Sequence, residues 1–190
     1  MADRFTFRAE AAHLSYSIAP VSNVLTDLSV KEAAYSIGNG AFSARDYLEA
    51  HLFAIDKYDP VLDAFLLVMT ESALEDADRA DLAQKNGEVL RPLHGIPVAI
   101  KDIIDVEGVP TTCHSGVAPI VNAQRDAIVI SRLRSAGALI IGKTALHEYA
   151  TGGPSFDLPW PPARNPWDRN YHPGGSSSGS AVAVSARMVP

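Results

Sequence analysis

Two segments decide the fold of this chain: GIPVAIKDII, residues 95–104, and GALIIGKT, residues 137–144. Each is a short apolar run that begins at a glycine, and the first also contains a proline, a pattern that is typical of a buried strand. Residues 124–136, which lie between them, have the pattern of a helix. A strand, a helix and a second strand in this order predict two parallel strands in an α/β layer.

The first part of the chain is predicted to be largely helical. Ser29 and Ser43 are each followed three residues later by an acidic side chain, which is the spacing of a capping box. We therefore expect a helix to begin directly after each serine. Residues 64–68, AFLLV, are expected to form a short buried strand, and residues 71–86 a surface helix that stops before a glycine.

Composition narrows the class of protein. The chain has 190 residues, 47% of them hydrophobic, and a formal net charge of -6, as expected for a globular protein. Its 16 Lys and Arg residues are scattered, which argues against binding of nucleic acid. Charged residues interrupt the most apolar stretches, and residues 1–20 lack the apolar core of a secretory signal, so we expect no membrane helix and no export. A lone cysteine, Cys113, agrees with the cytoplasmic location that this implies.

Two literal motif matches are not interpreted as sites. Residues 137–144 satisfy the P-loop pattern G-x-x-x-x-G-K-[ST], but a strand fills the positions where a P-loop needs free backbone amides. We therefore expect no phosphate site there. Lys143 is expected to cap or flank the end of the strand. Cys113 and His114 are adjacent, and adjacent side chains rarely point at one another, so this pair is not predicted to be catalytic.

Lys101 is the most unusual charged residue of the sequence. It ends a fully apolar strand, where an ammonium group would lose part of its hydration. This loss favours the neutral amine, which is the form that a general base needs. An alternative without a catalytic role is that Lys101 pairs with Asp102 or Asp105 and stays charged.

A cluster of glycine and serine, GGSSSGS, occupies residues 174–180 and ends a proline-rich irregular segment, residues 151–175. Such a composition is typical of a flexible linker. However, the cluster runs directly into AVAVSA, residues 181–186, which is a predicted helix of small apolar residues. Its serines would then lie at a helix N-terminus, where backbone N–H groups stabilise a developing negative charge. A serine there and a desolvated lysine nearby could form a Ser-Lys hydrolytic pair.

Three segments together resemble, in order and spacing, consecutive landmarks of the amidase signature family. They are GIPVAIKDIIDVEGVPTT (residues 95–112), GALIIGKTALHEYATGG (residues 137–153) and NPWDRNYHPGGSSSGSAVAV (residues 165–184). The resemblance implies an α/β sandwich with a mixed central sheet, of which this chain would be an incomplete N-terminal part. Residues 1–190 would then belong to a single amidase domain, with a helical region at 1–92 and the start of the signature core at 93–190.

Members of that family are serine hydrolases that cleave carboxamides with a Ser-Ser-Lys triad. By this resemblance Lys101 takes the place of the base. Ser176 takes the place of the bridging serine, which follows a cis peptide bond and relays a proton to the lysine. Gly174 and Gly175 would let substrate and backbone come close, and Ser177 would support the network by hydrogen bonding.

The family's nucleophilic serine lies about two dozen residues beyond the bridging serine, in a second Gly-Gly-Ser turn that also supplies the oxyanion hole. Residues 1–190 stop before that position. The resemblance therefore implies an amidase whose nucleophile is outside this chain, and a chain that is inactive alone. It also implies a small-molecule amide substrate, and neither a metal ion nor an organic cofactor.

Two alternatives stay open. One is the glutaminase subunit of the aminoacyl-tRNA amidotransferase, which would use the same triad to release ammonia from glutamine and would need partner subunits and tRNA. The other is an inactive pseudoenzyme or interaction module of 190 residues. For such a chain, an uncovered apolar sheet face would favour association into a homo-oligomer.

Overall fold

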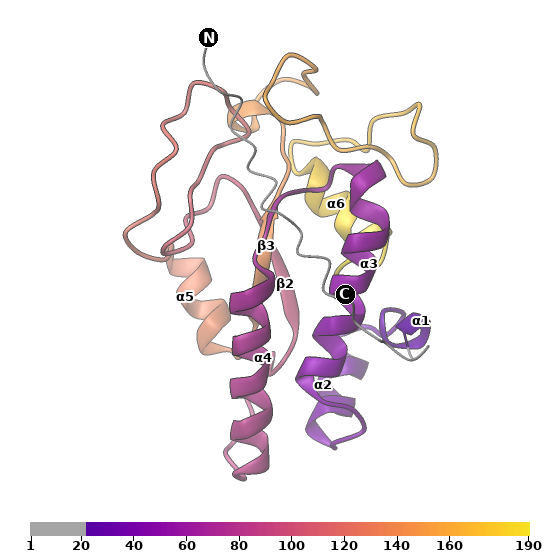
Figure 1. Ribbon diagram of the computed structural model, residues 1–190, viewed down its shortest axis with the longest axis vertical. Coiled ribbons are helices and arrows are strands. Elements are labelled where there is room, and N and C mark those ends of the chain that lie inside the picture. The colour runs from indigo at the N-terminus through magenta and orange to yellow at the C-terminus, as the bar shows by residue number, and fades with distance from the viewer. Residues whose placement is uncertain (1–21) are drawn as a thin grey trace.

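The structure, a computed structural model, describes residues 22–190 (Figure 1). The start of the chain, where we expect no secretory signal, and the first part of the predicted helical region lie outside these residues. The elements, in chain order, are α1 (Ser22–Leu25), α2 (Val30–Gly38), α3 (Ala44–Leu62), β1 (Phe65–Val68), α4 (Thr70–Lys85), β2 (Pro97–Lys101), α5 (Ile128–Ser135), β3 (Leu139–Thr144), the short 3₁₀ helix η1 (Glu148–Ala150) and α6 (Ser178–Ser185).

The described strands form one sheet in the order β1-β3-β2. β2 and β3 are parallel, and α5 lies in the connection between them, which confirms the predicted strand-helix-strand unit. β1 pairs with the other edge of β3 and runs antiparallel to it, so the predicted mixed sheet is also confirmed. We expected the residues of β1 to be buried, but they are half-buried. The reason is that β1 is an edge strand, with a neighbouring strand on one side only.

Both predicted helix starts are confirmed, at Val30 for α2 and at Ala44 for α3. In each case the capping serine accepts a hydrogen bond from the backbone three residues on, and the acidic side chain there accepts one from the serine backbone. Tertiary contact adds to the second cap: the carboxylate of Asp81 in α4 accepts hydrogen bonds from the backbone N–H groups of Ala44 and Arg45, at 2.7 and 3.1 Å. α4 therefore helps to fix where α3 begins.

α5 is shorter than predicted, because it begins at Ile128 and not near residue 124. The residues before Ile128 instead contact a distant segment of the chain, around Glu107. Ala123 forms an isolated bridge with Glu107, and the carboxylate of Asp126 accepts a 2.8 Å hydrogen bond from the backbone N–H of Glu107. These long-range contacts hold the backbone outside the helix, and nothing in the local sequence pattern reports them.

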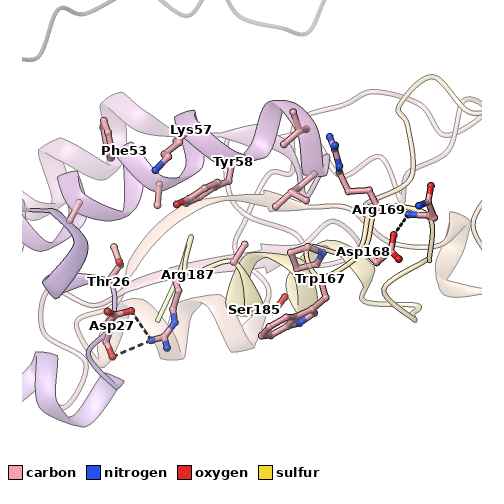
Figure 2. Close-up of a pocket in the computed structure, with 17 residues that line it drawn as sticks. Thr26, Asp27, Phe53, Lys57, Tyr58, Trp167, Asp168, Arg169, Ser185 and Arg187 are labelled. Carbon is pink, nitrogen blue, oxygen red and sulfur yellow. Dashed lines mark hydrogen bonds and ion pairs between the residues drawn. The ribbon is translucent and has the colours of Figure 1, made fainter.

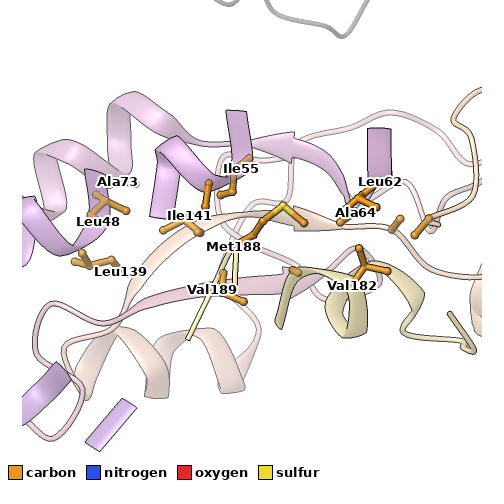
Figure 3. Packing of buried hydrophobic residues seen from close by; sticks show 14 of the residues in the cluster. Leu48, Ile55, Leu62, Ala64, Ala73, Leu139, Ile141, Val182, Met188 and Val189 are labelled. Atoms are coloured by element: carbon orange, nitrogen blue, oxygen red, sulfur yellow. The ribbon is translucent and has the colours of Figure 1, made fainter. Parts of the chain in front are cut away.

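Apolar side chains cover the sheet on both faces. On one face α3 and α6 pack against β3 through residues that include Ile55, Val182 and Ile141 (Figure 3). On the other face Ile130 of α5 packs in a cluster with residues of β2 and β3. Figure 1 shows α5 on one side of the strands and α3 with α6 on the other. This arrangement places the start of α6 at the carboxyl ends of the two parallel strands.

His51 is a fully buried residue of α3 whose ring packs edge-on against Tyr47, with the ring centroids 4.7 Å apart. Burial lowers the pKa of His51 from 6.5 to about 4. The unfolded chain therefore takes up a proton at His51 as the pH falls through 6.5, whereas the folded chain excludes it until about pH 4. The stabilisation that His51 gives as a neutral ring is present above pH 6.5 and is lost as the pH falls.

We expect this residue to remove roughly 3 kcal/mol of unfolding free energy between about pH 7 and pH 4. Urea titrations at a series of pH values would measure it. His51→Gln keeps a polar side chain but no longer titrates, so its unfolding free energy should depend less on pH by that amount. Parallel pH dependence in the two proteins would contradict this account.

Candidate active site

Lys101 is the last residue of β2 and lies beside Thr144, its register partner at the end of β3. The preceding side chain, Ile100, enters the cluster on the α5 side, so alternation along the strand directs Lys101 to the side of α6. There its Nζ atom donates a 2.7 Å hydrogen bond to Oγ of Ser176. The structure thus brings together the two residues that the sequence motifs indicate as base and bridging serine.

The glycine turn before α6 holds Ser176 in place. Gly174 has a φ of +84°, a conformation that favours glycine, and the peptide bond between Gly175 and Ser176 is cis, as the resemblance implies. A Cβ atom on Gly175 would lie 2.2 Å from the imidazole ring of His147. The backbone N–H of His147 donates a 3.0 Å hydrogen bond to the carbonyl of Ser176. Gly175 therefore allows the turn to pack directly on His147.

The first turn of α6 is fastened to the end of β3. The backbone N–H of Gly179 donates a 2.9 Å hydrogen bond to the carbonyl of Ala145, and Oγ of Ser180 lies 2.8 Å from Oγ1 of Thr144. Ser177 precedes the helix as its N-cap, is exposed, and makes no side-chain cap hydrogen bond. The serines of the cluster therefore lie at a helix N-terminus, as predicted, and the flexible-linker interpretation is wrong.

A buried ion pair lies close to the strand ends that carry Lys101 and Thr144, and it was not predicted. Asp102 and Lys143 are each 1% exposed, and 2.6 Å separates Oδ1 of Asp102 from Nζ of Lys143. Lys143 is thus not a residue that merely flanks the strand end, and Asp102 is engaged by Lys143 and not by Lys101. The P-loop pattern is, as expected, not a loop, since residues 139–144 form β3. The sequence did contain a signal for this ion pair: Asp102 and Lys143 carry opposite charges and lie at the corresponding ends of two apolar strands.

Two loops meet beside the site in a hydrogen-bonded corner. Cys113, His114 and Tyr149 all have φ near +50°, in the left-handed region. The backbone N–H of Tyr149 donates to the carbonyl of Cys113 at 3.0 Å, and that of Leu146 donates to Nδ1 of His114 at 3.2 Å. Nε2 of His114 is engaged by the carbonyl of Trp160. Both ring nitrogens of His114 therefore have backbone partners, in agreement with the expectation that it forms no catalytic pair with Cys113.

A groove of about 850 Å³ lies between α3, residues 166–170 and the end of α6 (Figure 2). Phe53, Tyr58 and Trp167 contribute aromatic side chains to it, and Trp167 is 85% exposed. None of the predicted site residues lines this groove. The candidate active site and the groove are therefore separate features of the surface.

Among residues 22–190, no group of three or more His, Cys, Asp or Glu side chains is placed to hold a metal ion. Within the same part of the chain, none of the helices combines the length and the apolar character that crossing a membrane requires.

Known sequences match most of this chain. The model of the Amidase family matches residues 46–190. The chain is 43% identical to one subunit of glutamyl-tRNA(Gln) amidotransferase from Synechococcus sp. (strain WH7803) over 159 residues, which are 84% of this chain and 33% of that protein. It is 40% identical to the same subunit from Salinispora arenicola over 166 residues, with 87% and 34% covered. The chain spans about a third of the length of the curated relatives it matches.

Solved structures agree with this match. The native peptide amidase from Stenotrophomonas maltophilia has a TM-score of 0.79 and 33% sequence identity, covering 86% of this chain and 35% of that one. Fatty acid amide hydrolase has a TM-score of 0.84 at 22% identity, covering 90% and 30%, and this likeness concerns the fold alone. The expected amidase-type α/β fold is thus confirmed. Because the family match extends from residue 46 to residue 190, this chain belongs to the amidase family.

Proposed function

We propose that this chain supplies the base and the relay serine of an enzyme that hydrolyses a carboxamide C–N bond through an acyl-enzyme. Lys101 is the base and Ser176 the relay. The observation that supports this best is the 2.7 Å hydrogen bond between Nζ of Lys101 and Oγ of Ser176. Membership of the amidase family supports it independently.

In this mechanism a neutral Lys101 accepts the hydroxyl proton of Ser176, and Ser176 in turn accepts the proton of the attacking serine. The attacking oxygen adds to the amide carbonyl, and the proton returns through Ser176 to the leaving amine. Water then hydrolyses the acyl-enzyme by the same relay. Gly174 and Gly175 shape the turn that carries Ser176, and Ser177 at the N-cap of α6 is proposed to support the network.

The attacking serine is proposed to lie about two dozen residues after Ser176, in a second Gly-Gly-Ser turn that follows residue 190. Residues 1–92 and 93–190 are then the helical region and the start of the core of one amidase domain. Reading the coding DNA beyond codon 190 tests this directly. An open frame with that turn supports the proposal, whereas an in-frame stop with stable, monodisperse expression favours an interaction module.

A fluorophosphonate probe provides a chemical test on the 190-residue chain. We expect no covalent adduct by intact-mass spectrometry, because Ser176 is hydrogen-bonded as a relay and the attacking serine is elsewhere. A serine hydrolase labelled in parallel checks the reagent. A stoichiometric adduct on Ser176, Ser177 or Ser178 would overturn the proposal and make that serine the nucleophile.

A second candidate is the glutaminase subunit of a tRNA amidotransferase. It is favoured by the 43% identity to the matched subunit of glutamyl-tRNA(Gln) amidotransferase. The chemistry of the triad would be the same, with glutamine as the amide and ammonia as the product passed on to partner subunits. Ammonia release measured with glutamine and with a panel of peptide and aryl amides distinguishes the two, since the glutaminase should prefer glutamine and depend on its partners.

A further inference from the structure

The proposed mechanism does not use the buried pair behind the base. Oδ1 of Asp102 lies 2.6 Å from Nζ of Lys143. Oδ2 of Asp102 accepts a 3.0 Å hydrogen bond from the backbone N–H of Thr112. Nζ of Lys143 also donates to Oγ1 of Thr111 and to the carbonyl of Pro110, at 3.1 and 3.2 Å. Both charges are therefore fully enclosed, and each has hydrogen-bond partners besides the other.

Each member of the pair is the sequence neighbour of a residue at the proposed site. Asp102 follows Lys101, and Lys143 precedes Thr144, the register partner of Lys101. The pair makes its contacts with residues 110–112, whereas Lys101 contacts the turn before α6. Lys143 is the register partner of Ile100, which lies in the cluster on the α5 side, whereas Lys101 points to the side of α6, so the two lysines lie on opposite faces of the sheet.

An uncompensated carboxylate beside the proposed base would oppose its role. A carboxylate close to a lysine favours the charged ammonium, which cannot accept a proton. Asp102 is next to Lys101 in sequence, but its charge is compensated by Lys143. Among residues 22–190, Lys101 forms no ion pair and donates to a neutral hydroxyl. The two charges of the pair also act in opposite directions on Cys113. Burial raises the pKa of its thiol, Asp102 and Asp105 raise it further, and Lys143 lowers it.

We propose that Lys143 is a positioning residue for the base: it holds the Asp102 carboxylate in a compensated pair, so that Lys101 has no uncompensated counter-ion. This inference rests on the proposed function, in which Lys101 acts as a neutral amine. Lys143 acts through Asp102 and does not touch the reacting atoms. Removing one charge of the pair would therefore change the charge state of Lys101, and the direction depends on which charge is removed.

The test measures how fast the Lys101 amine of the 190-residue chain is acylated by acetic anhydride, because only the neutral amine reacts. Peptide mapping by mass spectrometry gives the rate at Lys101 relative to Lys31, an exposed lysine of the same molecule. The variants are Asp102→Asn, Lys143→Gln and the double variant. Urea titrations of each variant show whether it is folded under the conditions used.

We expect Lys143→Gln to lower the relative rate about threefold or more, and Asp102→Asn to raise it by a similar factor, because the charge left behind would be buried beside the strand end that carries Lys101 and would be little screened by salt. The double variant should return to within about twofold of the original chain. Changes of the same sign in both single variants, or no change, would overturn the proposal, since loosening of the shared loop would act alike in both. If Lys143→Gln does not fold, the decision rests on Asp102→Asn, whose rate must rise and must fall again in the double variant.

This outcome is separate from that of the proposed function. Acylation reports the charge state of Lys101 whether or not the chain hydrolyses amides. Opposite rate changes together with full amide hydrolysis after loss of Lys101 would show that the pair controls the charge state of Lys101 but that Lys101 is not the base.

Discussion

Replacing Lys101 by alanine is expected to lower kcat for carboxamide hydrolysis by about four orders of magnitude or more, measured in the polypeptide that the complete open reading frame encodes. The reason is that the amine hydrogen-bonded to Ser176 at 2.7 Å is the group proposed to take the proton. Ser176→Ala should cause a loss of the same order. Because the two residues act as one relay, the double variant should lose little more than either single variant. Ammonia release under saturating amide measures all three.

Lys31→Ala serves as the matched control, since Lys31 is an exposed lysine of α2. Its activity should stay within about twofold of the original protein, because exposed substitutions away from special features change little. Losses that multiply in the double variant would show that Lys101 and Ser176 act independently. Activity retained after Lys101→Ala would refute the proposed base altogether.

Replacing Gly179 by alanine is expected to lower the unfolding free energy by about 3 kcal/mol or more. Alanine is normally favoured over glycine within a helix by about 1 kcal/mol. Here the added Cβ would lie 2.3 Å from the carbonyl oxygen of Ala64 and 2.4 Å from the backbone nitrogen of Ala145. These are backbone atoms of the sheet end, so they cannot rotate away, and the clash outweighs the helix preference. Denaturation with urea measures the difference.

Gly153→Ala is the matched control for this substitution. Gly153 is exposed, and a Cβ built there meets nothing within 4 Å. Its unfolding free energy should therefore change by no more than about 0.5 kcal/mol. Equal stability of the two variants would mean that α6 does not pack on the end of β3 as described.

Features that depend on near neighbours in the chain were predicted well. The capping serines at positions 29 and 43 act on backbone groups three residues away, so the pattern contains both partners. The parallel pair of β2 and β3 followed from two apolar runs separated by a helix. The predicted start of α5 was wrong, because distant residues near Glu107 engage the segment before Ile128.

For the candidate site, Lys101 and Ser176 were indicated by motifs that resemble a known family, and not by physical patterning alone. The apolar strand before Lys101 explains why this residue is half-buried, but it left Asp102 and Asp105 as alternative partners. Only the folded structure, in which Oδ1 of Asp102 lies 2.6 Å from Nζ of Lys143, shows that these two residues form the pair. Sequence patterns also could not reveal that Gly175 packs on the ring of His147.

Residue order was thus enough to predict most of the secondary structure around the site, because it depends on local periodicity. The mixed sheet and the family followed from the resemblance of three contiguous motifs to a known family. The folded chain decided which charges face one another and which face of β2 each side chain occupies. Such choices depend on strand register and on loops that return from distant parts of the chain. Lys101 therefore meets Ser176 on the α6 side of the sheet, while Lys143, which points to the other side, pairs with Asp102.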